Sequence, residues 1–324
     1  MVAHRPCWNE LITDFLIWVK GSNRAATTVR YYDSRLRGLA RWCAEQNIQP
    51  WEFAERHLRL YISARTDQGV SEATRSHDQI AAKCLFRHAA NEWPQVFAKS
   101  PLEKVKVRKP AERYREHASD EEVKALFDAI AKRWSSNNPG IGRFQPRERR
   151  FYCARDRALI GMLMCTGMRP DEMLRLTPDD IDRTDPNKPF VIIREAKGRR
   201  PRTIPLQPEM DDIIRTWQGV RGDCETRELF RSVFDEPLTG RRLRRIIDSY
   251  LENSGVQKRV TARVLRRYFL TAVVAEDFWA AVQIAGHRDP KTTMTYLAPT
   301  PEAVRTASLA ANPLRRSTAR VKKL

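Results

Sequence analysis

Acidic residues are scarce in this chain relative to basic ones, and the imbalance limits what it can bind. The 324 residues include 40 Asp and Glu against 59 Lys and Arg, which gives a formal net charge of +19. A compact chain with that excess repels itself unless a polyanion is present, and nucleic acid is the usual partner. Charge alone also fits a ribosome-associated protein or a merely soluble basic protein.

Long apolar runs and paired cysteines are also lacking. No stretch approaches the roughly 18 apolar residues of a membrane span, and the N-terminus leads into no apolar signal segment. The cysteines form no C-x-x-C pair and no cysteine–histidine cluster, which argues against a zinc site and fits a reducing compartment. We therefore expect a soluble cytoplasmic protein, associated with the nucleoid, with no membrane partner and no metal. The six cysteines are Cys7, Cys43, Cys84, Cys153, Cys165 and Cys224.

Residues 1–100 have the hydrophobic spacing of short helices. Apolar side chains recur at helical intervals from Leu11 to Val19 and again from Val29 to Trp42, and a third helix is expected near Trp51. Ser71 is a good N-cap for a fourth. Because most polar faces of these helices are basic, the pattern predicts a compact DNA-contacting module; a plain helical bundle is the alternative.

Residues 101–118 break this pattern and read as a basic linker. Few large apolar side chains occur here, and Pro101 and Pro110 interrupt regular structure. Such a segment is either an ordinary solvated connector or a tether that lies along a phosphate backbone. Its basic residues are Lys104, Lys106, Arg108, Lys109, Arg113 and Arg115.

A second domain is predicted at residues 119–312, followed by a basic tail at 313–324. Ser119 and Glu122 form a capping box that opens a helix, and residues 135–150 are expected to be a surface loop. An apolar helix is predicted over 154–165. Residues 190–195 and 202–206 are strand-like and flank a basic turn, which predicts a β-hairpin. The remainder is predicted to be helical, so the fold class is mainly α, with a mixed α/β second domain that holds a small antiparallel sheet.

Tyr296 suggests a chemistry for this second domain. It stands nine residues after the pair Gly286-His287. A phenol can attack a DNA phosphate if cations hold the non-bridging oxygens and an acid protonates the leaving 5′ oxygen. Arginine is the best clamp, since its planar fork matches two phosphate oxygens.

Candidate partners for Tyr296 occur at four separate places. Arg169 lies at a helix break after Gly167, and Glu172 three residues later can orient it. Lys197 lies in the hairpin turn, where nearby cations would lower its pKa so that it can donate a proton. Each would more commonly be structural or solvated if it stood alone. The remaining candidates are Arg263 and Arg266, side by side on one helix, and His287, which can hydrogen-bond a phosphate oxygen.

Taken in order along the chain, these residues resemble the tyrosine recombinase (phage integrase) family. Three blocks carry the resemblance: Thr166-Gly167-Met168-Arg169, the hairpin at 197–206, and Gly286-His287 with Tyr296. The resemblance covers most of the chain. It implies a helical SAM-like core-binding domain at about 9–93 and a catalytic domain at about 119–311. The architecture looks Xer-like, and we expect no N-terminal arm-binding domain.

The resemblance implies a role for each residue. Arg169 and Arg266 would clamp the scissile phosphate, Glu172 would hold Arg169, and Lys197 would protonate the leaving hydroxyl. His287 would bind a non-bridging oxygen and Tyr296 would form a 3′-phosphotyrosine. No metal, ATP or other cofactor is expected, since the phosphotyrosine conserves the bond energy. The partners would be double-stranded DNA with specific recombination sites, an accessory DNA-bending protein, and further copies of the chain. It would be a monomer or weak oligomer when free and a homo-tetramer on a Holliday junction.

Two residues depart from the family pattern. Arg263 stands where the family usually has histidine, and Arg267 stands where a second histidine is common. Arginine can bind phosphate but cannot act as a base near neutral pH. These departures favour a recombinase of a phage, transposon or integrative element, for integration, excision or resolution, over a housekeeping resolvase. The alternatives are a non-cleaving, sequence-specific DNA-binding protein of recombinase descent and a relaxing topoisomerase.

Overall fold

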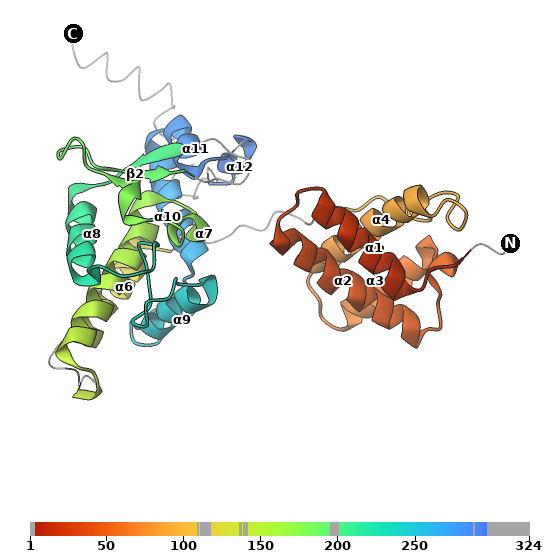
Figure 1. The fold of residues 1–324 in the computed structure, drawn as a ribbon, viewed down its shortest axis with the longest axis horizontal. Coiled ribbons are helices and arrows are strands. Elements are labelled where there is room, and N and C mark those ends of the chain that lie inside the picture. Colours follow the sequence, from red (N-terminus) through yellow and green to blue (C-terminus); the bar gives the residue numbers. More distant parts are fainter. Residues whose placement is uncertain are drawn as a thin grey trace, which may run out of the picture. The chain divides into compact units, whose positions relative to one another are not determined.

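The computed structural model shows two compact units, Met1–Arg113 and Tyr114–Leu324 (Figure 1). It describes residues 4–108, 110, 118–135, 138, 142–194, 201–287 and 289–296. Helices predominate, with one three-stranded antiparallel sheet, which confirms the predicted fold class. Within these ranges no helix combines the length and apolarity that crossing a bilayer requires.

The first unit is built from four helices around one apolar core. They are α1 (Trp8–Gly21), α2 (Ala26–Glu45), α3 (Glu55–Asp67) and α4 (Glu72–Glu92), with a short 3₁₀ turn at Pro50–Glu52. Phe15 of α1, Leu36 of α2 and Leu85 of α4 are almost fully buried in this core. The hydroxyl of Ser71 accepts a hydrogen bond from the amide of Thr74 at 3.3 Å, so the predicted N-cap of the fourth helix is confirmed.

Residues 101–108 pack against the first unit, although the sequence placed them in a linker. Leu102 is fully buried in the core of this unit. The ammonium of Lys83 donates to the carbonyl of Val105, and the hydroxyl of Ser76 donates to the carbonyl of Arg108 at 3.0 Å. Leu102 and the two hydrogen bonds from Lys83 and Ser76 of α4 therefore attach this segment to the first unit. The domain boundaries themselves stay predictions, and residues 111–117 lie outside the described ranges.

The second unit is organised around α6 (Pro146–Thr166), which packs against α5 (Asp120–Trp134), α8 (Pro208–Arg221) and α10 (Ala262–Glu276). The helix begins at Pro146, so the predicted loop at 135–150 is wrong for its last five residues. Pro146 suits the first helical position, and the carboxylate of Glu148 accepts from the amide of Gln145 at 2.9 Å. The remaining helices are α7 (Pro170–Met173), α9 (Gly240–Leu251), α11 (Phe278–Ala285) and α12 (Lys291–Met294).

The sheet has the strand order β1-β2-β3, with β1 at Ile181–Asp182, β2 at Phe190–Ile193 and β3 at Arg202–Pro205. Strands β2 and β3 pair antiparallel with Val191 opposite Ile204, so the predicted hairpin is confirmed; β1 was not predicted. The turn that contains Lys197 lies outside the described residues. In Figure 1 the sheet, α7, α11 and α12 gather at one end of this unit, and α6 starts at the other.

A buried polar chain connects α5, α6 and α9 within the core of the second unit. The hydroxyl of Tyr250 donates to Asp156 Oδ2 at 2.7 Å and accepts from Trp134 Nε1 at 2.8 Å. Burial, with the neighbouring carboxylate of Asp156, raises the pKa of Tyr250 far above its usual range. Because each buried polar atom finds a partner, the chain fixes how these three helices pack.

We expect Tyr250→Phe to lower the free energy of unfolding by about 2 kcal/mol, since it leaves a buried carboxylate oxygen without its donor. The matched control is Tyr268→Phe, which removes an exposed bond to Asp120 Oδ1 at 2.8 Å. That change should cost less than about 0.5 kcal/mol. Urea unfolding of both variants, followed by circular dichroism, makes the comparison. Equal losses of unfolding free energy in the two variants would show that the burial of the Tyr250–Asp156 hydrogen bond adds nothing to stability.

Candidate active site

Arg169 is placed by a sharp break between two helices. Helix α6 ends at Gly167, whose φ of 57° lies in the left-handed region that favours glycine. A Cβ there would meet Phe269 at 2.7 Å, so glycine also permits the close approach of α10. Arg169 follows as the N-cap residue of α7, and Pro170 occupies the first helical position, as predicted. The break turns Arg169 away from the axis of α6.

Glu172 is a buried carboxylate that two arginines share. Its oxygens accept from the amide of Arg169 at 2.9 Å and from Arg169 Nη1 at 3.0 Å. Arg202 adds a fork, with Nη2 at 2.7 Å and Nη1 at 3.2 Å from the two oxygens. Burial by itself raises the pKa of Glu172, but the hydrogen bonds from Arg202 and from the Arg169 amide outweigh it and lower the pKa below 4.5. Glu172 is therefore ionised at neutral pH.

Arg202 belongs to this site and was missed in the sequence. Its side chain is only 10% exposed, and Nε donates to the carbonyl of Ile284 at 2.9 Å. A signal was present: Arg202 stands two residues before Ile204 on β3, and alternate residues of a strand share one face. Ile204 is fully buried, so the same face carries Arg202 inward.

The carboxyl end of α11 is held by three arginines from three different segments. The carbonyls of Ile284, Ala285 and Gly286 accept, respectively, from Arg202 Nε at 2.9 Å, Arg266 Nη2 at 3.0 Å and Arg169 Nη2 at 3.5 Å. The last carbonyls of a helix lack intrahelical donors, and its dipole there favours cations. The arginines therefore fix the chain at the point from which His287 and Tyr296 follow.

Arg266 is buried, although it carries a charge. Nη1 donates to the carbonyl of Gly167 at 2.6 Å, which ties α10 to the break after α6. Burial and the nearby Arg169 lower the pKa of Arg266 to about 10, and Tyr296 and Glu172 partly oppose this fall. Arg266 therefore stays protonated at neutral pH, with both carbonyl contacts intact.

His287 lies between Arg266 and α12. Its Nε2 is 3.3 Å from Arg266 Nη2, and its Nδ1 is 2.8 Å from the hydroxyl oxygen of Thr293. Burial is the main reason that the pKa of His287 falls to about 4, and the positive charges of Arg266, Arg169 and Arg202 lower it further. The imidazole is therefore neutral at physiological pH.

Tyr296 is partly buried, at the end of a short helical segment. Its amide donates to the carbonyl of Thr293 at 3.0 Å, just after α12. Its ring is stacked on that of His287, with the centroids 6.1 Å apart and the planes at 9°. The structure thus brings together residues from three separate segments of the sequence: Arg169 and Glu172, Arg266, and His287 and Tyr296.

The contacts of the described residues do not join two of the predicted site residues, Arg263 and Lys197, to this group. Arg263 is exposed on α10, and no hydrogen bond or ion pair among the described residues involves it. Lys197 lies in the undescribed turn before β3, so its position relative to Tyr296 stays a prediction. The hairpin that carries Lys197 is nevertheless joined to the site, because β3 begins with Arg202.

The site carries a net positive charge that suits an anion. Within the described ranges, the guanidiniums of Arg169, Arg202 and Arg266 meet one carboxylate, that of Glu172. The adjacent His287 is neutral and adds no charge. Arginine forks bind phosphate better than any other side chain, so the excess charge fits a phosphate group next to Tyr296.

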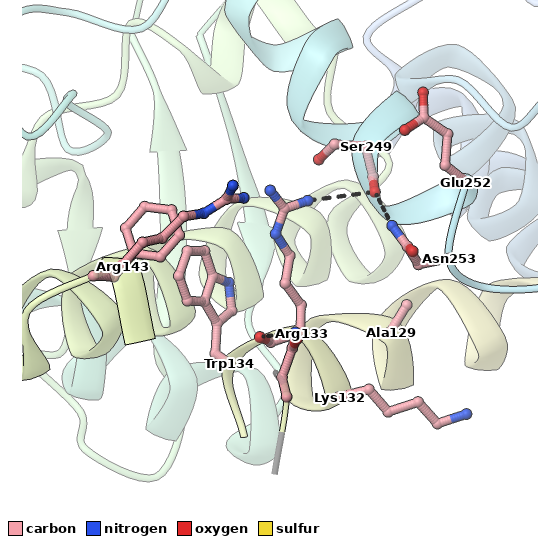
Figure 2. Close-up of a pocket in the computed structure, with 10 residues that line it drawn as sticks. Ala129, Lys132, Arg133, Trp134, Arg143, Ser249, Glu252 and Asn253 are labelled. Carbon is pink, nitrogen blue, oxygen red and sulfur yellow. Dashed lines mark hydrogen bonds between the residues drawn. The ribbon is translucent and has the colours of Figure 1, made fainter. Parts of the chain in front are cut away.

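A cavity lies elsewhere in the second unit, between the ends of α5 and α9 and the start of α6. It measures about 460 Å³, and Arg133 and Arg143 point toward one another across it (Figure 2). Arg133 Nη1 donates to the carbonyl of Ser249 at 3.4 Å. The 21 residues of α6, at about 1.5 Å each, separate this cavity from Arg169 by roughly 30 Å. It is therefore no part of the site around Tyr296.

We expect Arg202→Met to lower the free energy of unfolding at pH 7 by about 3 kcal/mol, because it leaves a buried carboxylate with one partner fewer. Since Arg202 helps to hold the pKa of Glu172 below that of an ordinary glutamate, its stabilisation is complete at neutral pH and is lost as the pH falls through that lowered pKa. The deficit should therefore stay constant from pH 7 down to the ordinary glutamate pKa and shrink as the pH falls further.

The matched control for this prediction is Arg244→Met. It removes an exposed pair with Asp248 at 3.4 Å and should cost less than about 1 kcal/mol. Adding Glu172→Gln to Arg202→Met should recover part of the loss, because the uncompensated charge is then gone. Urea titrations at several pH values test all three. A deficit for Arg202→Met that does not change with pH would refute the charge-based explanation.

Comparison with known proteins places the chain in one family. Residues 145–303 match the family described as "Phage integrase family", and residues 12–92 match "Phage integrase, N-terminal SAM-like domain". The chain is 25% identical over 304 residues to tyrosine recombinase XerA of Thermococcus kodakarensis, covering 92% of this chain and 94% of that protein.

Two solved structures show the same fold. The XerH site-specific recombinase bound to its difH substrate has a TM-score of 0.71 and 20% identity, with coverage of 94% and 84% of the two chains. A lambda integrase tetramer bound to a Holliday junction has a TM-score of 0.70 and 14% identity, with coverage of 90% and 78%. With both family domains matched in order along the chain, this protein belongs to the phage integrase family and is a tyrosine recombinase of the Xer-like kind.

Proposed function

We propose that this recombinase cleaves and rejoins DNA at specific sites through a 3′-phosphotyrosine on Tyr296. The observation that carries the proposal is the convergence of Arg169 and Arg266 on the chain segment that leads to Tyr296. Two guanidiniums beside a phenol supply what phosphoryl transfer needs: a nucleophile, and positive charge where the transition state gains negative charge.

The chemistry divides among the site residues. The phenolic oxygen of Tyr296 attacks the phosphorus and its proton passes to solvent, while Arg169 and Arg266 hold the non-bridging oxygens. The bond to the 5′ oxygen breaks, and Lys197 gives that oxygen a proton. A 5′ hydroxyl from a second strand then returns a proton to Lys197 and attacks the phosphotyrosine. The bond to Tyr296 breaks, the phenol regains a proton from solvent, and the phosphodiester is restored. Because one phosphoester bond replaces another at each step, the cycle requires no metal, ATP or other cofactor.

The proposed partners are double-stranded DNA and three further copies of the chain. The net charge of +19 supports a polyanionic partner, and the related lambda integrase forms a tetramer on a Holliday junction. Four protomers would exchange strands between two sites, with an accessory protein that bends the DNA. Exposed Arg263 would add a phosphate contact beside Arg266 on α10.

We assign the reaction to a mobile element: a phage, a transposon or an integrative element. The departures at Arg263 and Arg267 from the histidines usual in the family support this assignment over chromosome-dimer resolution. Inverted repeats or an attachment core in the DNA next to the gene would identify the element. Their absence, together with a chromosomal resolution site, would overturn the assignment.

We expect wild-type protein to form a covalent adduct with a nicked suicide duplex, and Tyr296→Phe to form none, because phenylalanine lacks the attacking oxygen. Tyr268→Phe, the same change on α10, should leave the adduct intact. Denaturing gel electrophoresis of labelled DNA measures the adduct. Specific binding by the wild type without any adduct would favour a non-cleaving DNA-binding protein, and relaxation of arbitrary plasmids would favour a topoisomerase.

We expect Lys197→Ala to slow adduct formation by about 100-fold or more, the range for loss of a general acid. Replacing the bridging 5′ oxygen of the substrate by sulfur should return the variant to within a few-fold of wild type, since a thiolate leaves without a proton. Arg169→Ala should not be rescued in this way. If sulfur rescues neither variant, Lys197 acts by binding rather than as the acid.

A further inference from the structure

Thr293 is a buried hydroxyl in direct contact with the histidine of the site. It is fully buried on α12, and its oxygen is 2.8 Å from His287 Nδ1. Its backbone carbonyl accepts from the amide of Tyr296 at 3.0 Å. One residue thus contacts both His287 and Tyr296, and neither the sequence motifs nor the roles proposed above assign it anything.

The hydrogen bonds around His287 determine which ring nitrogen carries the proton. Arg266 can only donate, so its Nη2 at 3.3 Å requires a lone pair on His287 Nε2. A neutral imidazole has one N–H, which must then be on Nδ1. The Nδ1–H donates to the hydroxyl oxygen of Thr293. The free protein therefore holds His287 in the Nδ1–H form.

A phosphate in the site requires the opposite arrangement. Phosphate oxygens accept hydrogen bonds, so His287 can bind one through Nε2 only if Nε2 carries the proton. Nδ1 then becomes an acceptor and needs a donor. A threonine hydroxyl both donates and accepts, so Thr293 can serve both forms without moving.

We propose that Thr293 is a positioning residue that gives His287 Nδ1 a hydrogen-bond partner in either neutral tautomer and reverses its hydrogen bond when a phosphate enters. Nδ1 loses its proton to solvent and Nε2 gains one from solvent, so the total number of protons on His287 is unchanged. This inference rests on the proposed function, in which Arg266 and His287 hold the scissile phosphate. The hydroxyl acts through His287 and does not touch the DNA.

The charges around His287 favour a neutral ring that changes tautomer over a ring that gains a proton. Positive charges face it from Arg266 on α10, Arg169 beside α7 and Arg202 on β3, against one carboxylate, Glu172. The ring of Tyr296 lies nearly parallel to that of His287, with the centroids 6.1 Å apart. With burial, these cations hold the pKa of His287 near 4, well below physiological pH. The ring therefore stays neutral, and only the position of its single proton is left to change.

The first test reads the tautomer directly and needs no DNA cleavage. Full-length protein with ¹⁵N-labelled histidine is compared by NMR with His287→Gln, which assigns the signal of His287 among the six histidines. We expect Nδ1 to be protonated in the free wild type and Nε2 to become protonated as inorganic phosphate is added. Thr293→Ser should give the same result as wild type. In Thr293→Val, His287 should no longer be in the Nδ1–H form alone, because Nδ1–H has lost its acceptor. A protonated Nε2 in the free protein would overturn the proposal.

The second test measures the rate of adduct formation on the suicide duplex. Thr293→Val keeps the shape of the side chain but removes the hydroxyl, and we expect a rate about tenfold lower, the effect of one lost buried hydrogen bond. Thr293→Ser keeps the hydroxyl and should stay within about threefold of wild type. Equal rates for the valine variant and wild type would refute the inference. If wild type itself forms no adduct, the proposed function fails, while the tautomer measurement still decides the role of Thr293.

Discussion

The site depends on one buried carboxylate. The carboxylate of Glu172 accepts from the backbone amide and the side chain of Arg169 and from both terminal nitrogens of the Arg202 guanidinium. It therefore fixes two cations that would otherwise repel each other. A buried carboxylate is costly unless it is fully hydrogen-bonded, and here four donors satisfy its two oxygens. Glu172 thereby neutralises part of the positive charge of Arg169 and Arg202.

The positive charge that remains is held by backbone dipoles rather than by further acids. Three successive carbonyls at the end of α11 accept from Arg169, Arg202 and Arg266. A carbonyl orients a guanidinium without neutralising it, because it carries only a partial charge. The arginines are therefore positioned in advance and keep a net charge for an incoming phosphate. Gly286 permits this close packing: its φ is 58°, and a Cβ there would meet Arg202 at 2.9 Å.

Much of this could be predicted from local patterns in the sequence. The helix end at Gly167, the proline start of α7 and the β2–β3 hairpin follow from turn and capping chemistry, which involves neighbouring residues alone. Arg202 could not be recognised in the same way, because its partners are distant in the sequence. Thr293 could not be recognised because Thr292 and Thr295 beside it offer the same hydroxyl group. Arg202 bonds the carbonyl of Ile284, 82 positions away, and every residue has a carbonyl. Strand alternation was the one usable signal, and it indicates burial without naming a partner.

The ring of His287 shows how the same arginines constrain the chemistry as well as the fold. A histidine beside a phosphate would ordinarily be expected to donate as a cation, but the cations that bind α11 also face this ring. Burial and these cations together hold the ring neutral. In the proposed reaction, a proton for the phosphate oxygen would therefore come from a change of tautomer, and the other ring nitrogen would need a hydrogen-bond donor. Thr293 is fully buried at that nitrogen, where solvent cannot replace it. In the proposed mechanism, the positive charge that would bind the phosphate thus also accounts for a hydroxyl, rather than an apolar side chain, next to His287 Nδ1.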